Sequence, residues 1–175
     1  MVEQAVRLWR FHGIKVHGHE SMPTREVCET ARAMRVPILV DVAGQAQVVD
    51  MLAPQYPQVD FIVAHLGSFG DDWRAHQQVV DQLVRYPNVY SDTSGVRRFD
   101  YIVQAVRRAG PRKVLFGSDG PWLHPGGSAL STTIRAGMLI FSVEMFSYSL
   151  RSGESLFPPE ANPLTMPNPF QPTMI

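Results

Sequence analysis

Short hydrophobic runs alternate with amphipathic segments along the first two thirds of the chain. Five runs rich in Val, Ile, Leu and Phe recur about every two dozen residues, a spacing typical of strand-helix-strand units. They lie at 13–17, 37–42, 60–66, 88–94 and 113–119. The segments between them, 24–34, 46–56, 71–86 and 96–110, place apolar residues at helical spacing. Strands that are each followed by an amphipathic helix predict a parallel sheet covered by helices.

The two later helices have the clearest patterns. Gly110 stands where it can cap the end of the helix in 96–110, and either Asp71 or Asp72 can cap the start of the helix in 71–86. The apolar faces that we expect to be buried are Phe99, Ile102, Val103 and Val106 in the later helix, and Trp73, His76, Val80 and Leu83 in the earlier one.

Polar side chains gather where the predicted strands end, at His17, Asp41, His65, Asp92 and Asp119. TIM-type barrels carry their chemistry at this end of their strands. No predicted strand is followed by the three-glycine loop of a dinucleotide-binding sheet. A complete barrel needs eight strand-helix units and about 250 residues, whereas five units are found here. The predicted fold is therefore α/β, a partial TIM-type barrel.

The pattern changes near residue 126. We expect residues 1–126 to form the partial barrel domain and 127–175 an atypical tail without a strand-helix unit. Prolines crowd the end of the chain, at 158, 159, 163, 167, 169 and 172, and proline interrupts regular structure. We expect disorder after 151.

Composition narrows the classes of partner. Lys and Arg together number 16, as do Asp and Glu, so no basic surplus favours nucleic acid or an anionic membrane. Cys28 is the single cysteine, which excludes an internal disulfide and a cysteine-based metal cluster. The longest apolar stretch, 136–150, is too short and too polar to span a bilayer, and the N-terminus lacks the apolar region of a secretion signal. The expectation is a cytoplasmic protein that acts on a small molecule.

Two of the strand-end residues point to metal chemistry. A lone histidine such as His65 at the end of an apolar strand is commonly a core residue. Asp119 ends another apolar strand, where a carboxylate is costly to desolvate unless a positive or hydrogen-bonding group receives it. Capping of the following turn is one explanation of Asp119. The other is that a histidine and a carboxylate at the ends of parallel strands together supply what a divalent metal needs.

Five stretches carry a resemblance to a known family. FIVAHLGSF at 61–69, NVYSDTSG at 88–95 and KVLFGSDGPWLHP at 113–125, in that order, resemble the last three barrel strands of the amidohydrolase-related family. Its members are metal-dependent hydrolases and related aromatic-acid decarboxylases. GIKVHGH and VPILVDVAG resemble the fourth and fifth strands, so the resemblance covers about residues 10–126 and lacks the N-terminal strands.

The resemblance implies a site. His65 would lie in the metal site, and Asp119 would ligate the metal or accept a proton from the attacking water. Asp41 stands where the family often has a histidine ligand, and it is either a third ligand or an acceptor that orients a histidine. The expected cofactor is a divalent metal ion, with zinc the first candidate. Expected substrate-binding residues are Lys15, His17, Trp122 and His124, whereas His12 and His76 are interpreted as ordinary structural or surface residues. Asp92, with Thr93 and Ser94, is expected to close its strand and to hydrogen-bond a neighbouring histidine.

The predicted function is hydrolysis by metal-activated water. The alternative within the family is non-oxidative decarboxylation, and the alternative from another class is a non-catalytic remnant that needs a partner to fold. The family's His-x-His strand does not precede residue 10, and His17-Gly-His19 is not given its role because it follows the match to the fourth strand. We therefore expect weak metal binding, little turnover, and self-association through open sheet edges.

Overall fold

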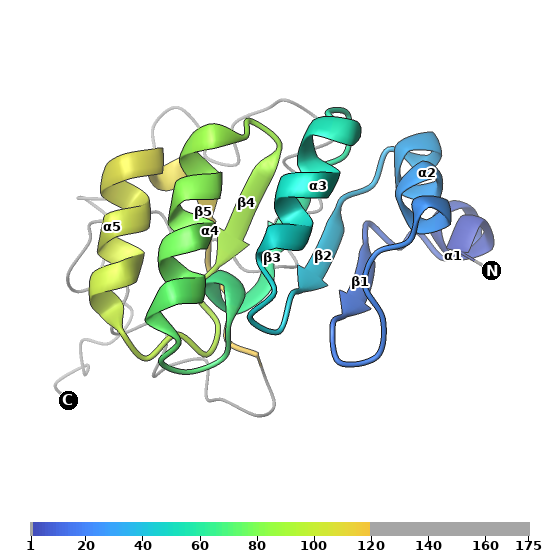
Figure 1. Ribbon diagram of the computed structural model, residues 1–175. Coiled ribbons are helices and arrows are strands. Elements are labelled where there is room, and N and C mark those ends of the chain that lie inside the picture. The colour runs from blue at the N-terminus through green and yellow to red at the C-terminus, as the bar shows by residue number, and fades with distance from the viewer. Residues whose placement is uncertain (1, 120–175) are drawn as a thin grey trace, which may run out of the picture.

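A computed structural model describes residues 2–119 of the 175-residue chain. Its described part is an α/β layer in which five parallel strands follow one another in the order β1-β2-β3-β4-β5. Helices α2 to α5 lie along one side of this sheet (Figure 1). The elements are α1 Val2–Leu8, β1 Ile14–His17, α2 Arg25–Met34, β2 Ile38–Asp41, α3 Gln47–Gln55, β3 Phe61–Val63, η1 Ala64–Gly67, α4 Trp73–Arg85, β4 Val89–Asp92, α5 Phe99–Ala109, η2 Pro111–Lys113 and β5 Val114–Leu115.

Local hydrogen bonds fix the ends of the helices. The Thr24 hydroxyl accepts from the Val27 amide at the start of α2. Asp72, one of the two residues expected at this position, accepts from the amides of Arg74 and Ala75 at the start of α4. Gly110 ends α5 with φ +92°, a conformation that costs glycine little. Both later helices therefore begin or end at a residue that the sequence predicted.

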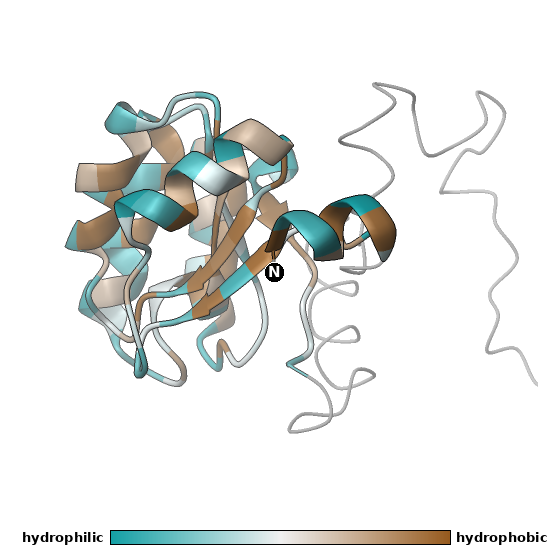
Figure 2. Ribbon diagram, turned by 90° about the vertical axis from the view of Figure 1, so that its right-hand side faces the viewer, coloured by the Kyte–Doolittle hydropathy of each residue, from teal (hydrophilic) through white to brown (hydrophobic). Residues whose placement is uncertain are grey.

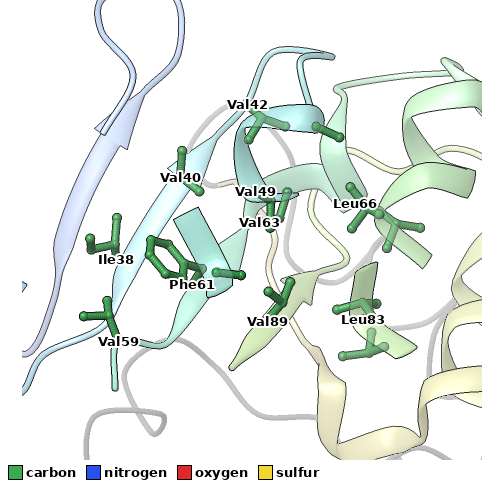
Figure 3. Packing of buried hydrophobic residues seen from close by; sticks show 14 of the residues in the cluster. Ile38, Val40, Val42, Val49, Val59, Phe61, Val63, Leu66, Leu83 and Val89 are labelled. Atoms are coloured by element: carbon green, nitrogen blue, oxygen red, sulfur yellow. The ribbon is translucent and has the colours of Figure 1, made fainter. Parts of the chain in front are cut away.

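The hydrophobic core lies between the sheet and the helices (Figure 3). Alternate strand residues face it, because successive side chains of a strand point to opposite faces. The strands are mostly hydrophobic, whereas the helices carry both hydrophilic and hydrophobic residues (Figure 2). Fully buried members of the core are Ile38, Val40, Val49, Phe61, Val63, Val79, Leu83 and Val89.

The opposite face of the sheet carries its own row of aligned side chains. Lys15, Leu39, Ile62 and Tyr90 are aligned across β1 to β4 by the strand register. In a closed barrel this face is the interior. One step further toward the C-terminal ends, His17 and Asp41 are paired in register on the same face.

Several details differ from the sequence predictions. Helix α1 was not predicted, and β3 and β5 are shorter than the runs at 60–66 and 113–119. Trp73 is 51% exposed, because it begins α4 before the turns that pack on the sheet. On α5 the buried residues are Tyr101, Ile102 and Ala105. Of the predicted face, Ile102 is therefore buried, and Phe99 and Val106 are partly buried against the core.

The boundary expected at residue 126 and the tail at 127–175 lie outside the described residues. None of the helices in the described range is long and apolar enough to cross a membrane.

Candidate active site

The strand-end residues share one end of the sheet. Because all five strands are parallel, their C-terminal ends meet at the same edge. His17, Asp41 and Asp92 are the last residues of β1, β2 and β4, and His65 and Asp119 follow β3 and β5. This edge is where barrel enzymes of the TIM type build their sites.

His65 sits in a left-handed turn rather than in the strand itself. Strand β3 ends at Val63, and the backbone then takes φ values of +58° at His65 and +49° at Leu66. Simple alternation would have placed His65 on the helix-covered face with Phe61 and Val63. The left-handed backbone breaks that alternation, so His65 is presented at the edge of the sheet while only 5% of it is exposed.

The His65 imidazole is held by Ser94, which follows β4. Nδ1 lies 2.9 Å from the Ser94 carbonyl oxygen and 2.9 Å from its hydroxyl oxygen. The Ser94 hydroxyl donates to Asp92 Oδ1 at 2.5 Å, so its oxygen is free to accept from the ring. Nδ1 therefore carries the proton and donates, and in the neutral ring the lone pair is on Nε2.

Asp92 organises the backbone around this pair. Its Oδ1 accepts from the amide of His65 and from the amide of Ser94, each at 3.0 Å. Asp92 is 6% exposed, so the carboxylate is satisfied by these donors rather than by solvent. The ends of β3 and β4 are thereby tied together at the proposed site.

Phe69 and Gly95 complete the surroundings of His65. The Phe69 ring meets the imidazole edge to face at a centroid distance of 5.4 Å, and 52% of Phe69 is exposed. A Cβ on Gly95 would lie 2.5 Å from the Phe69 ring, and Gly95 has φ +67°. Only glycine permits this backbone and this close approach together.

Asp41 and His17 form a second pair on the edge. His17 Nε2 lies 3.5 Å from Asp41 Oδ2, and Asp41 Oδ1 accepts from the Ala43 amide at 2.9 Å. The His17 side chain is 47% exposed, and its ring lies 5.2 Å from that of His19. Asp41 thus faces a histidine from the neighbouring strand at ion-pair distance.

The segment that ends in Asp119 packs against the support of His65. A Cβ on Gly117 would lie 3.1 Å from both Asp92 Cγ and Ser94 Cβ, so this backbone passes directly over them. Asp119 follows two residues later, partly buried, with φ +55°. Trp122 and His124 lie outside the described residues. Lys15 is exposed on the same face of β1 as His17.

The chemistry of His65 suits a metal ligand. Ligating histidines commonly donate their other ring N–H to a carbonyl or carboxylate, which fixes the tautomer. His65 has this arrangement, with Ser94 as the acceptor. Within residues 2–119, however, no group of three or more His, Cys, Asp or Glu side chains is arranged to hold a metal ion. The described residues therefore offer a preorganised ligand and not a complete coordination set.

A cluster of groups with shifted pKa values lies at the other end of the sheet. Burial lowers the pKa of Lys113 and raises the pKa of Asp60 and of Tyr90. Lys113 Nζ donates to the carbonyl oxygens of Tyr86 and Val89, each at 2.9 Å, and lies over the Tyr90 ring. These contacts join β5 to the start of β4. Shifted pKa values here reflect a structural contact rather than the proposed site.

Comparison with known proteins decides the family. Residues 3–134 match the sequence profile of the amidohydrolase family, which is well over half of the chain. The chain belongs to the amidohydrolase family. No curated protein sequence matches it.

Solved structures with the same fold support this assignment. A dihydroxybenzoic acid decarboxylase from a Polaromonas species, with bound manganese and an inhibitor, is 18% identical with a TM-score of 0.54, and the alignment covers 79% of this chain and 58% of the other. An amidohydrolase from Burkholderia multivorans with bound zinc is 16% identical with a TM-score of 0.62, covering 83% and 65%. A TIM-barrel protein from Bordetella bronchiseptica is 13% identical with a TM-score of 0.58, covering 73% and 51%.

These solved structures show the fold and the share of it that the chain covers. At such identities the likeness concerns the fold, which is that of a TIM-type barrel. The chain spans less than two thirds of each of the three solved chains. Its five-stranded sheet is accordingly part of a barrel of this type.

Sequence reasoning indicated part of the support of His65. Asp92, with Thr93 and Ser94, was expected to hydrogen-bond a neighbouring histidine, and Ser94 does contact His65 Nδ1. Phe69 was given no role at the site. The Asp-x-Ser-Gly stretch after β4 carries a usable signal, because an aspartate followed two residues later by serine favours a local side-chain turn. Phe69 had no comparable signal, since its contact with His65 depends on the left-handed turn between them.

Proposed function

We propose that this chain carries part of the active site of a metal-dependent hydrolase, with His65 and Asp119 at its centre. The observation that supports the proposal most is the fixed His65 tautomer. Ser94 accepts from Nδ1, so Nε2 is left with the lone pair that a metal ion or a proton requires. Membership of the amidohydrolase family supports this class of chemistry. Two solved structures of the same fold contain bound manganese or zinc.

Each residue has a role in this proposal. His65 and Asp119 would hold a divalent metal ion, with zinc the first candidate. Asp41 would contribute either directly or by orienting His17, and the 3.5 Å separation favours the second. A bound divalent cation supplies positive charge that makes water nucleophilic at neutral pH. Asp119 accepts the proton that the attacking water loses.

The substrate is proposed to be a small molecule that binds over the same edge of the sheet. Lys15 and His17 are exposed on one face of β1, where they can donate hydrogen bonds to an anionic or carbonyl oxygen. Trp122 and His124 follow Asp119 along the chain and are proposed to contact the substrate as well.

Decarboxylation is the alternative that one specific comparison favours, because the Polaromonas structure is a decarboxylase. In that case the same residues would hold a carboxylate substrate. A chain that needs a partner to complete its site is the other alternative, and it is favoured by the incomplete ligand set among residues 2–119.

Product analysis tests the proposal. The purified chain is assayed, with zinc or manganese added, on ester and lactone substrates and on hydroxybenzoic acids, with detection of acid release and of CO2. We expect slow ester or lactone hydrolysis that Asp119→Asn lowers at least about 100-fold, as loss of a proton acceptor does. Asp60→Asn, a carboxylate at the opposite end of the sheet, is the matched control and retains activity. CO2 release without hydrolysis, or hydrolysis unaffected by Asp119→Asn, would overturn the proposal.

A further inference from the structure

The turn that presents His65 is strained. His65, Leu66 and Gly67 have successive φ values of +58°, +49° and +97°. A left-handed conformation is unfavourable for a non-glycine residue, and two such residues occur in sequence here. Strain of this kind persists only where the surrounding structure holds it in place. The contacts that hold this turn therefore matter for the position of His65.

His76 contacts the turn from α4. It is completely buried, with Nδ1 3.1 Å from the Leu66 carbonyl oxygen and Nε2 3.2 Å from the Gly70 carbonyl oxygen. Its two ring nitrogens thus bracket the segment from Leu66 to Gly70. This histidine had been interpreted from the sequence as an ordinary structural or surface residue, and nothing in the helical pattern indicated a double contact.

The two acceptors determine the protonation state of the ring. A carbonyl oxygen accepts and cannot donate, and a neutral imidazole has a single N–H. Only the imidazolium ion can donate to Leu66 and Gly70 at once. With one proton removed, a lone pair would face a carbonyl oxygen at hydrogen-bond distance, which is repulsive.

Neighbouring groups stabilise a buried cation at this position. The Tyr101 ring lies 5.3 Å from the His76 ring, within the range of a cation–π contact. On α5, Asp100 has a lowered pKa, chiefly through its hydrogen bond from Arg98. Arg98 is the opposing cation on that helix, and its charge is paired with Asp100. On α4 itself, the backbone carbonyl of the N-capping Asp72 accepts from the His76 amide.

We propose that His76 is a positioning residue, an imidazolium that donates from both ring nitrogens to hold the left-handed turn and, through it, the ring of His65. The importance of His65 rests on the function proposed above, whereas the His76 contacts themselves do not depend on it. Loss of one His76 proton would release either Leu66 or Gly70, and the turn would relax toward ordinary backbone angles. His65 would then lose its fixed donation to Ser94.

Histidine-ring nitrogen NMR of the full chain tests the inference directly. We expect both ring nitrogens of His76 to carry protons at neutral pH, because each faces a carbonyl oxygen, and His65 to show one tautomer with the proton on Nδ1. A singly protonated His76 ring at neutral pH would overturn the proposal. The two rings are assigned from spectra of His76→Gln and His65→Asn.

The His65 tautomer in variants separates positioning from general stability. In His76→Gln, both N–H donors belong to one nitrogen and cannot bracket the Leu66–Gly70 segment as the two separated ring nitrogens do, so His65 should change from a single tautomer to a mixture. Val80→Ala is the matched control, since Val80 is equally buried one turn later on α4 and loses core packing without touching the Leu66–Gly70 contacts. Equal His65 spectra in both folded variants would overturn the proposal. Should His76→Gln fail to fold, the wild-type spectrum decides alone. If the chain hydrolyses no substrate, the proposed function is wrong, but the NMR results expected for His76 and His65 stay the same.

Discussion

Ser94 holds the imidazole of His65 from two directions, because its carbonyl and hydroxyl oxygens each lie 2.9 Å from Nδ1. The two residues come from the ends of neighbouring parallel strands, β3 and β4. Their contact converts a buried histidine into one with a defined tautomer, which is what both a metal ligand and a general base require.

Asp92 is expected to be essential for the stability of this edge. Asp92→Ala leaves the buried amides of His65 and Ser94 without their acceptor, and each unpaired donor costs about 1–3 kcal/mol. We expect the free energy of unfolding to fall by at least about 2 kcal/mol, measured by urea denaturation. Asp81→Ala is the control, because its ion pair with Arg108 is exposed and contributes about 0–1 kcal/mol. Equal losses in both variants would contradict the role given to Asp92.

Gly95 is expected to tolerate no side chain. Gly95→Ala is expected to lower the free energy of unfolding by about 1–2 kcal/mol, because the alanine must adopt a left-handed conformation. It must also displace the Phe69 ring, and overpacking of this kind adds about 1–3 kcal/mol. Gly44→Ala is the matched control, since Gly44 also has positive φ but an added Cβ would meet only Asp72 Oδ2 at 3.7 Å, an ordinary contact. Thermal denaturation should show the larger loss for Gly95→Ala, and a larger loss for Gly44→Ala would refute the packing argument.

Asp60 is expected to make the stability of the protein fall as the pH rises. Burial raises its pKa above the usual 3.8, and the opposing attraction to Lys113 is smaller. A carboxyl group whose pKa is higher in the folded state than in the unfolded state stabilises the fold at pH values below its unfolded-state pKa. That contribution is lost as the pH rises through the folded-state pKa. Asp60→Asn removes this titration. Relative to wild type, the variant should therefore gain stability between about pH 4 and pH 7 in urea denaturation. A relative loss over that interval would show that the Lys113 attraction dominates.

Self-association is expected through the sheet edges. Among the described strands, β1 and β5 each have one neighbour, and unpaired strand edges favour pairing with other chains. Exposed apolar side chains at Leu8, Trp9 and Phe11 lie just before β1. Size-exclusion chromatography with light scattering should show a mass that rises with protein concentration. A constant monomer mass over the whole concentration range would contradict this expectation.

The sequence was sufficient for the architecture because strand alternation and helical spacing are local properties. The runs at 13–17, 37–42 and 88–94 contain β1, β2 and β4, which are one to three residues shorter, and Asp72 and Gly110 cap helices as expected. Parallel strands then placed the polar residues at one edge. These inferences need only the order of residues and the geometry of a parallel sheet.

The inner organisation of the site could not be predicted in the same way. The left-handed backbone at His65 has no local signature, because histidine and leucine adopt it only under tertiary restraint. A histidine contact was expected for the stretch from Asp92 to Ser94, but not that Ser94 would hold Nδ1 of His65, 29 positions earlier. The double contact of His76 with Leu66 and Gly70 was not expected at all. Such contacts depend on how strands and helices pack, which periodicity does not encode.

Metal binding by the purified chain tests the central claim most directly. Calorimetric titration with zinc is compared for wild type, His65→Asn, Asp119→Asn and the opposite-end control Asp60→Asn. The account predicts weak binding by wild type, which His65→Asn and Asp119→Asn each weaken further by about 10–100-fold or more while Asp60→Asn leaves it unchanged. Zinc binding that is unaffected by both His65→Asn and Asp119→Asn would contradict it.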